Sequence, residues 1–198
     1  MNYYQEFLKI SKSCGECEQK RKLLLHACCA PCSSASLEKV KDNFDITVYF
    51  YNPNITNAEE YQKRLAEEER FLSEVYGESV KLICGEYAPE VFYSLSAGLE
   101  NQPERGARCL KCYAERLLKT AQTAKKNGFD YFATTLTLSP HKDANALNKI
   151  GYEIQEEIGV KYLPTDFKKD NGYKRSIELS KIYGLYRQNY CGCEFSVR

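Results

Sequence analysis

Residues 23–34, LLLHACCAPCSS, begin as a buried β-strand and then place three cysteines within five positions. An α/β protein usually turns at the end of such a strand with glycines. Four further short segments, rich in β-branched or aromatic residues, also read as strands. With the first, the expected strands cover residues 22–27, 45–51, 79–84, 130–137 and, more weakly, 160–165.

Helical patterns separate these strands. Residues 57–77 carry an apolar stripe and end in a glycine, and residues 109–128 repeat this arrangement with Leu110, Leu117, Leu118 and Ala121 expected on the buried side. Another helix is expected from around Ser33. Strands alternating with helices indicate an α/β fold, a mostly parallel sheet with helices on both faces, whose ligand site lies beyond the carboxyl ends of the strands.

The chain of 198 residues, 43% of them hydrophobic, is long enough for one sizeable core. We expect a single domain over residues 1–198, with residues 1–21 as an N-terminal extension or helix and residues 22–198 as the catalytic core. A net charge of +1 gives no global argument for a polyanionic partner. Neither a signal sequence nor a membrane span is apparent, so a cytoplasmic protein without a membrane partner is expected.

Ten cysteines are the anomaly, and most of them are clustered. In a reducing compartment, clustered cysteines are more often metal-binding or catalytic than structural. The lone Cys84, at the end of a strand-like segment, is interpreted as a core residue. The clusters are Cys14 and Cys17, then Cys28, Cys29 and Cys32, then Cys109 and Cys112, and finally Cys191 and Cys193.

Several of these thiols precede or begin expected helices, where the helix dipole favours the thiolate. The loop 96–108 is expected to lie over the site and to deliver Cys109 to the start of its helix. Soft thiolates without nearby histidines select zinc or an iron–sulfur cluster, and spacing alone does not separate the two. The position at a sheet edge favours a working iron–sulfur cluster, with structural zinc and metal-free reactive thiols as alternatives.

Six segments together resemble the cobalamin-independent epoxyqueuosine reductase family, from about residue 22 to the C-terminus. They are LLLHACCAPCS, YNPNITNAEEYQKR, RCLKCYAERL, FATTLTLSPHK, TDFKK and LYRQNYCGCEFS. The resemblance implies a HUP-type sheet, similar to that of adenine nucleotide α-hydrolases. It also implies a 4Fe-4S cluster and reduction of the epoxide of epoxyqueuosine at the wobble position of tRNA.

The ligand set that the resemblance and the expected helix starts indicate is Cys28, Cys29, Cys109 and Cys112. Cys32 is a substitute ligand or, more simply, a residue packed in the first turn of its helix. The pair of Cys14 and Cys17 falls outside the family's pattern and is interpreted as an accidental pair near a mobile terminus, with a second metal site as the alternative.

Removing an epoxide oxygen as water takes two electrons and two protons, so an acid or a Lewis acid is needed at that oxygen. Asp166 could protonate it or hold a second iron, and its alternative is an N-cap or surface carboxylate. His141 is a second candidate acid, with a solvated loop histidine as the alternative. His26 is interpreted as a hydrogen-bonded structural residue rather than a catalytic one.

Cys191 and Cys193 are expected to form a redox-active disulfide near the cluster. Residues two apart can just reach disulfide distance, and Gly192 relieves the backbone between them. Ligation of the cluster or of a second iron, and a purely structural tail, are the alternatives. No flavin fingerprint is apparent, so the electrons are expected to come from an external donor protein.

The resemblance implies a tRNA partner, the anticodon stem-loop of the GUN type that carries epoxyqueuosine. The basic residues of 105–126 and 161–198 flank the expected site and would suit its phosphates, although solvated helix faces would give the same counts. Possible stacking surfaces are Tyr173, Tyr183, Tyr186 and Tyr190, the last three of which are equally compatible with a packed helix stripe.

Two other function classes were weighed. An ATP-using tRNA thiolase of the same sheet class would need a glycine-containing phosphate loop after the first strand, and CCAPCSSAS has no glycine. ATP is therefore not expected as a cofactor, and the resemblance to a cobalamin-independent family implies that cobalamin is not needed either. A non-catalytic RNA-binding domain held by zinc is the second alternative, and the colour of the purified protein would distinguish it.

Overall fold

A five-stranded sheet forms the centre of the computed structural model, which describes residues 2–196. Its order is β3-β2-β1-β4-β5, and every neighbouring pair is parallel. This confirms the α/β class and the parallel sheet. The strands are β1 (Arg21–Ala27), β2 (Phe44–Phe50), β3 (Lys81–Cys84), β4 (Tyr131–Thr134) and β5 (Lys161–Tyr162).

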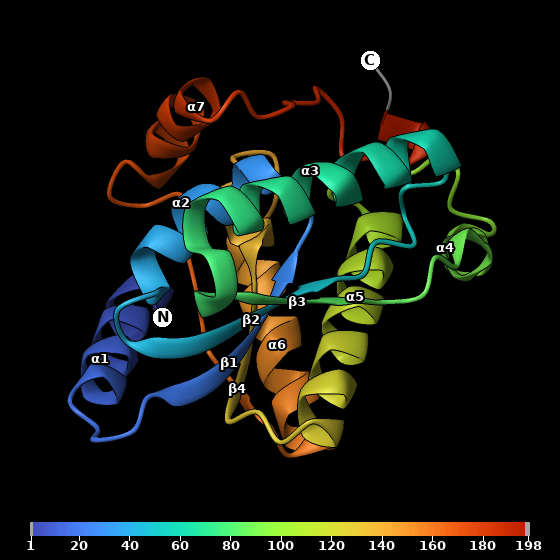
Figure 1. The fold of residues 1–198 in the computed structure, drawn as a ribbon. Helices are drawn as coiled ribbons and strands as arrows, with labels where there is room; N and C mark the ends of the chain where they lie inside the picture. Colours follow the sequence, from blue (N-terminus) through green and yellow to red (C-terminus); the bar gives the residue numbers. More distant parts are fainter. Residues whose placement is uncertain (1, 197–198) are drawn as a thin grey trace.

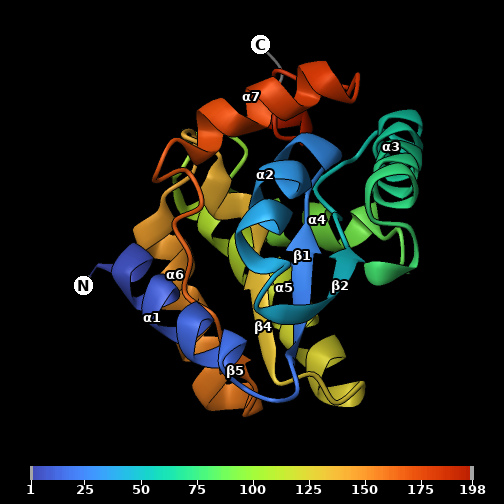
Figure 2. The same cartoon turned by 60° about the vertical axis from the view of Figure 1, so that its left-hand side comes forward.

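Helices cover both faces of this sheet (Figures 1 and 2). Alternate residues of β1 point to opposite faces, so Leu23 and Leu25 pack with α1, α2, α3 and α7, whereas Leu24 packs with α5 and α6. The helices are α1 (Tyr3–Gly15), α2 (Ala30–Val40), α3 (Ala58–Tyr76), α4 (Pro89–Ser96), α5 (Ala107–Lys126), α6 (Ala144–Ile158) and α7 (Gly172–Ile182).

The order of the strands creates a crevice above β1 and β4. From β1 the chain runs outward to β2 and β3 on one side, and β4 and β5 extend the sheet on the other. The connections that leave β1 and β4 therefore diverge, and a doubly wound sheet binds its ligands at such a point. The cysteines that follow β1 lie at this place.

Two expected strands are shorter than their patterns indicate. The segment 130–137 leaves the sheet after Thr134, whose hydroxyl accepts a hydrogen bond from the Leu136 amide at 3.1 Å and starts a short 3-10 helix. The segment 160–165 pairs over two residues only. Beyond them, the side chain of Asn148 bonds both the amide and the carbonyl of Thr165, replacing the sheet ladder.

Helix boundaries follow local capping chemistry. Asn57 accepts the Glu60 amide at 2.9 Å and starts α3, and Gly77 ends it with a φ of +54°, close to the expected limits of 57 and 77. Helix α2 begins at Ala30, earlier than the expected start around Ser33, because Pro31 fits the first helical turn. Cys29 consequently occupies the N-cap position.

Three packing expectations are wrong. Cys84 is exposed rather than in the core, because β3 is an edge strand. Leu110 is 40% exposed on α5, while Leu117 and Ala121 of the same expected stripe are buried. Cys14 is buried against the sheet in α1, so the N-terminal cysteine pair belongs to a packed helix and the turn after it rather than to a mobile end.

None of the helices within residues 2–196 combines the length and the apolar character needed to cross a membrane.

Candidate active site

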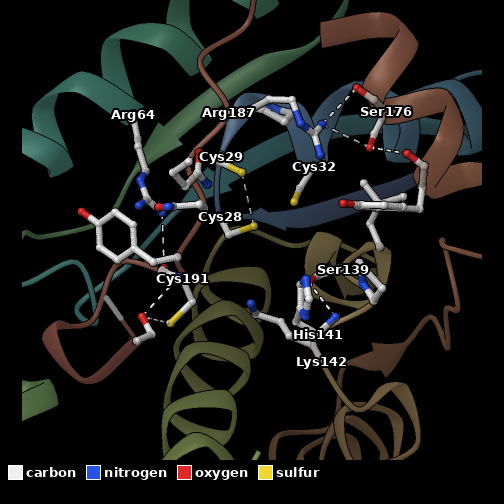
Figure 3. Close-up of a pocket in the computed structure, with 18 of the residues that line it drawn as sticks. Cys28, Cys29, Cys32, Arg64, Ser139, His141, Lys142, Ser176, Arg187 and Cys191 are labelled. Carbon is white, nitrogen blue, oxygen red and sulfur yellow. Dashed lines mark hydrogen bonds between the residues drawn. The ribbon is translucent and has the colours of Figure 1, made fainter. Parts of the chain in front are cut away.

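Three cysteine sulfurs meet where β1 passes into α2. The Sγ atoms of Cys28, Cys29 and Cys32 all lie within 4.8 Å of one another, and those of Cys28 and Cys29 are 3.8 Å apart (Figure 3). Cys29 is buried, and the other two are half-buried. Within residues 2–196, this is the one group of three or more Cys, His, Asp or Glu side chains close enough to share a metal ion.

The hydrogen bonds inside this group concentrate negative charge on one sulfur. Thiols of Cys29 and Cys32 lower the pKa of Cys28 well below its usual value. In return, the hydrogen bond to Cys28 raises the pKa of Cys29 to about 12 and that of Cys32 well above its usual value. This arrangement favours the thiolate at Cys28 over Cys29 and Cys32, and a cation such as a metal ion would favour deprotonation of all three.

The three cysteines form part of the wall of a cavity of about 370 Å³, within the range of small-ligand sites. Cys191, from the C-terminal segment, lines the same cavity. So do four basic side chains, Arg64, Arg116, Lys142 and Arg187, together with one acidic side chain, Glu104. The cavity is thus rich in sulfur and in positive charge.

Cys109 and Cys112 line a narrow adjoining cavity of about 20 Å³. Cys109 is the third residue of α5, as the position of the 96–108 loop predicted. Burial raises the pKa of Cys112 to about 11 and also raises that of Cys109. Cys191 lines both cavities, so the four predicted cluster ligands are distributed over two adjoining spaces that Cys191 joins.

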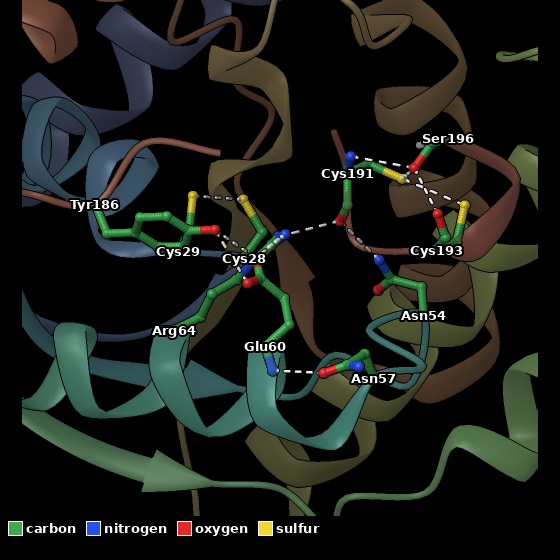
Figure 4. A network of polar contacts seen from close by, with 10 residues as sticks. All are labelled: Cys28, Cys29, Asn54, Asn57, Glu60, Arg64, Tyr186, Cys191, Cys193 and Ser196. Carbon is green, nitrogen blue, oxygen red and sulfur yellow. Dashed lines mark hydrogen bonds and ion pairs between the residues drawn. The ribbon is translucent and has the colours of Figure 1, made fainter. Parts of the chain in front are cut away.

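The thiols of Cys191 and Cys193 face each other at 3.5 Å, and both are free in the structure (Figure 4). The Cys191 carbonyl accepts hydrogen bonds from Asn54 at 3.0 Å and from Arg64 at 3.3 Å. Gly192 adopts a φ of +110°, which favours glycine. The Cys193 hydrogen bond lowers the pKa of Cys191 well below its usual value, giving this pair one reactive thiolate.

Arg116 is a fully buried cation that lines both cavities and that the sequence analysis did not single out. Its guanidinium donates to Asn52 Oδ1 at 2.5 Å and to His26 Nε2 at 3.3 Å. Within residues 2–196, no carboxylate lies within 4.0 Å of it to form an ion pair. A signal existed in the sequence, because Arg116 follows Cys112 by four positions and so shares its helix face.

His26 is structural, as expected. It is fully buried, and its Nδ1 lies 2.9 Å from the Thr134 hydroxyl. Burial lowers its pKa to about 3, so the ring is neutral. Its Nε2 faces both the Tyr51 carbonyl, an acceptor at 3.0 Å, and the Arg116 Nε, a donor at 3.3 Å. His26 therefore connects β1 with β4 and with the loop after β2, and it contacts Arg116 of α5.

The loop between β4 and α6 brings two further groups to the main cavity. His141 is exposed and lines it, and the amine of Lys142 extends toward the space between Cys28 and Cys191 (Figure 3). Burial lowers the pKa of Lys142, but the Cys191 and Cys28 thiolates outweigh it and raise the pKa overall. Arg105 holds this loop by donating to the His141 carbonyl at 2.9 Å.

Asp166 lies on the same edge of the sheet but lines a different, neighbouring cavity, to which Lys142 also contributes. Its Oδ1 is 3.0 Å from the Lys168 amine. The carboxylate is half-buried, so this ion pair is partly shielded from water. Asp166 is therefore near the cysteine cavity without forming part of its wall.

The tyrosines expected as stacking surfaces have different surroundings. Tyr173 and Tyr190 line the main cavity. Tyr186 instead bonds Glu60 and lies under the Lys63 amine, and Tyr183 packs against Phe71. Tyr183 and Tyr186 are therefore packed side chains, whereas Tyr173 and Tyr190 lie where a base in the cavity could contact them.

Comparison with known proteins identifies the family. The family model described as "Epoxyqueuosine reductase QueH" matches residues 23–198. A protein of that name from Streptococcus pyogenes serotype M1 is 42% identical over 100% of this chain and 79% of its own length. One from Staphylococcus epidermidis is 43% identical over 99% of this chain and 84% of its own. One from Thermotoga maritima is 37% identical over 88% of this chain and 90% of its own.

The match begins within β1 and includes every cysteine that lines the two cavities. A doubly wound sheet with a sulfur-lined crevice at its switch point, read together with this near-complete match, leads to one conclusion: the chain belongs to the epoxyqueuosine reductase QueH family.

Proposed function

We propose that the chain reduces epoxyqueuosine to queuosine at the wobble position of tRNA by means of a 4Fe-4S cluster. Membership of an oxidoreductase family supports the reaction. The observation that carries the proposal beyond the family name is the group of three cysteine sulfurs within 4.8 Å at the end of β1. The substrate would enter the 370 Å³ cavity that these sulfurs line.

The residues fit an iron–sulfur centre by the chemistry of their donors. Thiolates are soft ligands, and no His, Asp or Glu within residues 2–196 joins the sulfur group. We propose that Cys28 and Cys29 hold the cluster from one side, and Cys109 and Cys112 from α5. Cys32 is the nearest substitute for any one of them, because its sulfur already lies within the group.

The buried charges support an anionic occupant between the two cavities. Arg116 is 2% exposed and has no acidic partner among the described residues, and Lys142 joins it in the walls of both cavities. An uncompensated buried cation is costly, so a group of opposite charge nearby stabilises it. Thiolates gathered around a metal centre would supply that charge, whether the metal is iron or zinc.

The reaction removes the epoxide oxygen as water and leaves an alkene, which consumes two electrons and two protons. When bound, an iron–sulfur cluster supplies electrons singly at potentials that side chains do not reach. Cys191 and Cys193 would store the pair of electrons. Forming their disulfide releases two electrons and two protons, and an external donor protein would then return the pair to the dithiol state.

Two residues are proposed for the oxygen atom. His141 lines the cavity and is exposed, so it can exchange protons with solvent and donate one to the epoxide oxygen. Asp166 would serve as a second acid or as a hard ligand for a second iron. Either role requires the Asp166 carboxylate to leave the Lys168 amine, with which it is paired at 3.0 Å.

A zinc-held RNA-binding domain and an ATP-dependent thiolase are the competing functions. Anaerobic purification followed by a visible spectrum and by iron and sulfide analysis separates the first, because zinc thiolates are colourless. Turnover of epoxyqueuosine RNA without added ATP or cobalamin separates the second. A colourless protein containing zinc, or turnover that depends on ATP or cobalamin, would contradict the proposed function.

A further inference from the structure

Two arginines near α7 have very different partners. Arg175, inside the helix, presents its Nε and Nη2 edge to Glu38 at 2.9 and 2.8 Å, and its Nη1 bonds Glu178. Arg187, just beyond the helix, has no carboxylate within 4.0 Å among residues 2–196. The charge of Arg175 is therefore neutralised by protein groups, and that of Arg187 is not.

Arg187 is nevertheless held in place. Its Nη1 donates to the Ser176 carbonyl at 3.2 Å (Figure 3). The same atom donates to the Ser180 hydroxyl at 3.1 Å, and both serines are buried. Its guanidinium also lies 5.8 Å from the centre of the Tyr173 ring. Little side-chain entropy remains to be lost when such an arginine binds a ligand, so its orientation is prepared in advance.

The Nε and Nη2 atoms form the edge of the Arg187 guanidinium that can bind two oxygens at once, and this edge makes no hydrogen bond to the described residues. All of its hydrogen bonds within the described chain use Nη1, which leaves Nε and Nη2 available. This is the same edge that Arg175 presents to the two oxygens of Glu38. Two parallel N–H groups on that edge match two oxygens of a carboxylate or a phosphate.

The place of this edge indicates which anion it takes. Arg187 is exposed and lines the same cavity whose wall holds Cys28, Cys29 and Cys32. The other three cations of that wall are engaged or deeper. Arg64 is paired with Glu60 at 2.6 Å, Arg116 is buried, and the Lys142 amine is directed toward Cys28 and Cys191. A base that reaches the cysteines brings its own backbone phosphates to the mouth of the cavity.

We infer that Arg187 binds one phosphodiester group adjoining the modified nucleotide, and so fixes the depth to which the base enters the cavity. It acts as a positioning residue rather than as a catalytic one. The inference rests on the proposed tRNA substrate and extends it to one named contact. It predicts that Arg187 contributes to RNA binding through one phosphate and leaves the sulfur site unchanged.

The test pairs a protein change with a backbone change in the RNA. Arg187→Gln, Arg187→Lys and the matched control Arg175→Gln are compared for binding to an anticodon stem-loop carrying epoxyqueuosine. In a second set of RNAs, each molecule carries a single neutral methylphosphonate, placed at a different linkage around the wobble nucleotide. We expect Arg187→Gln to weaken binding of the natural backbone roughly tenfold or more, because a charged, bidentate hydrogen bond is lost.

One methylphosphonate RNA should bind the parent and Arg187→Gln equally, since the contact is already missing from it. On the natural backbone, the affinity of Arg187→Lys should lie between those of the parent and of Arg187→Gln, because lysine keeps the charge and loses the bidentate geometry. Arg175→Gln should bind all the RNAs as the parent does. With Arg187→Gln, KM should rise and kcat at saturating RNA should also fall, because the base is no longer held at one depth, while the iron content stays that of the parent.

Two results would overturn the inference. The first is an equal loss of affinity for every methylphosphonate RNA, which would mean that Arg187 meets no single phosphate. The second is unchanged RNA binding with altered iron content or an altered visible spectrum, which would make Arg187 a counter-charge for the metal site. In both cases the parent enzyme still reduces epoxyqueuosine, so these failures are distinct from failure of the proposed function.

Discussion

The sulfur atoms of Cys191 and Cys193 lie 3.5 Å apart although only Gly192 separates the two residues. A disulfide bond is about 2.05 Å long, so a small movement would close this pair. The positive φ of Gly192 allows the tight turn that brings them together. The Cys193 hydrogen bond, which lowers the pKa of Cys191, supplies the thiolate that thiol–disulfide chemistry requires.

Replacement of Cys191 or Cys193 by alanine should leave the iron and sulfide content unchanged. Enzyme that has been reduced beforehand and freed of excess reductant should not complete one turnover, because the proposed cluster alone would store one electron and the epoxide requires two. Multiple turnover should fail, because the pair no longer accepts electrons from the donor. Rapid-quench analysis of the RNA nucleosides measures both regimes. Loss of iron in either variant would instead make that cysteine a ligand.

Replacement of Cys28, Cys29, Cys109 or Cys112 by serine should degrade the cluster and abolish reduction, because a hydroxyl is a poor ligand for iron. Iron and sulfide analysis of anaerobically purified protein measures the loss. Cys84→Ser is the matched control, since Cys84 is exposed on an edge strand away from the cavities. Full iron content and normal turnover in two of the four variants would refute the ligand set.

Replacement of Arg116 by glutamine should shift the midpoint potential of the cluster to a more negative value. A buried cation stabilises the reduced and more negative state of a neighbouring centre, and glutamine keeps hydrogen-bonding capacity without the charge. A redox titration followed by electron paramagnetic resonance measures the shift. Lys119→Gln, on an exposed position of the same helix, should leave the potential unchanged.

An unchanged potential in Arg116→Gln, with full cluster content, would show that the guanidinium charge does not act on the cluster. A shift of equal size in Lys119→Gln would show instead that the net charge of the protein, rather than the buried position of Arg116, sets the potential.

Glu68 should make the protein less stable as the pH rises. Its carboxylate is fully buried, neither oxygen has a hydrogen-bond partner among the described residues, and burial raises its pKa to about 8. The folded state therefore keeps a proton that the unfolded state releases near its ordinary pKa of 4.5. Between these two values, the free energy of unfolding should fall by up to about 1.4 kcal/mol per pH unit.

Glu68→Gln removes this titration, so its stability relative to the parent should increase from pH 5 to pH 8 and then stay constant. Thermal unfolding midpoints of both proteins, measured in the same buffers, give the difference directly and cancel contributions from other groups. A difference that does not vary with pH would mean that Glu68 is charged in the folded protein.

Much of the fold follows from local patterns in the sequence. The helices α3 and α5 are amphipathic and carry glycines near their ends, so their limits were predicted to within two residues. The early ends of β4 at Thr134 and of β5 at Tyr162 were not predicted, because side-chain hydrogen bonds of Thr134 and Asn148 replace the ladder beyond them. The Thr134 bond is local, whereas Asn148 lies 17 positions from Thr165, so no pattern within the expected strand reveals this second partner.

The sequence predicted the location of the cysteines after β1 better than that of Cys191 in the C-terminal segment. The cysteines after β1 could be placed at the sheet edge because they directly follow a buried strand. The position of Cys191 between two cavities could not, because its segment has no periodic pattern and is held by Asn54 and Arg64. Hydrogen bonds to a backbone carbonyl leave no mark in the sequence.

The pairing of β1 with β4 has a consequence for how the molecule is assembled. His26 and Thr134, which meet across these strands, are 108 positions apart in the chain. A contact so distant requires closure of a long loop before it contributes any stability, so it forms slowly. Until it forms, the thiol of Cys28 lacks its Thr135 neighbour and remains open to solvent and oxidants.

In small zinc domains the metal drives folding, because the apoprotein has too little core to fold alone. Here the sheet carries buried apolar residues on both faces, and most of them are aliphatic or aromatic side chains rather than cysteines. The expected order of events is therefore the reverse, with closure of the central strands first and metal insertion second. Biogenesis would then depend on delivery of iron and sulfide to an already folded acceptor rather than to a nascent chain.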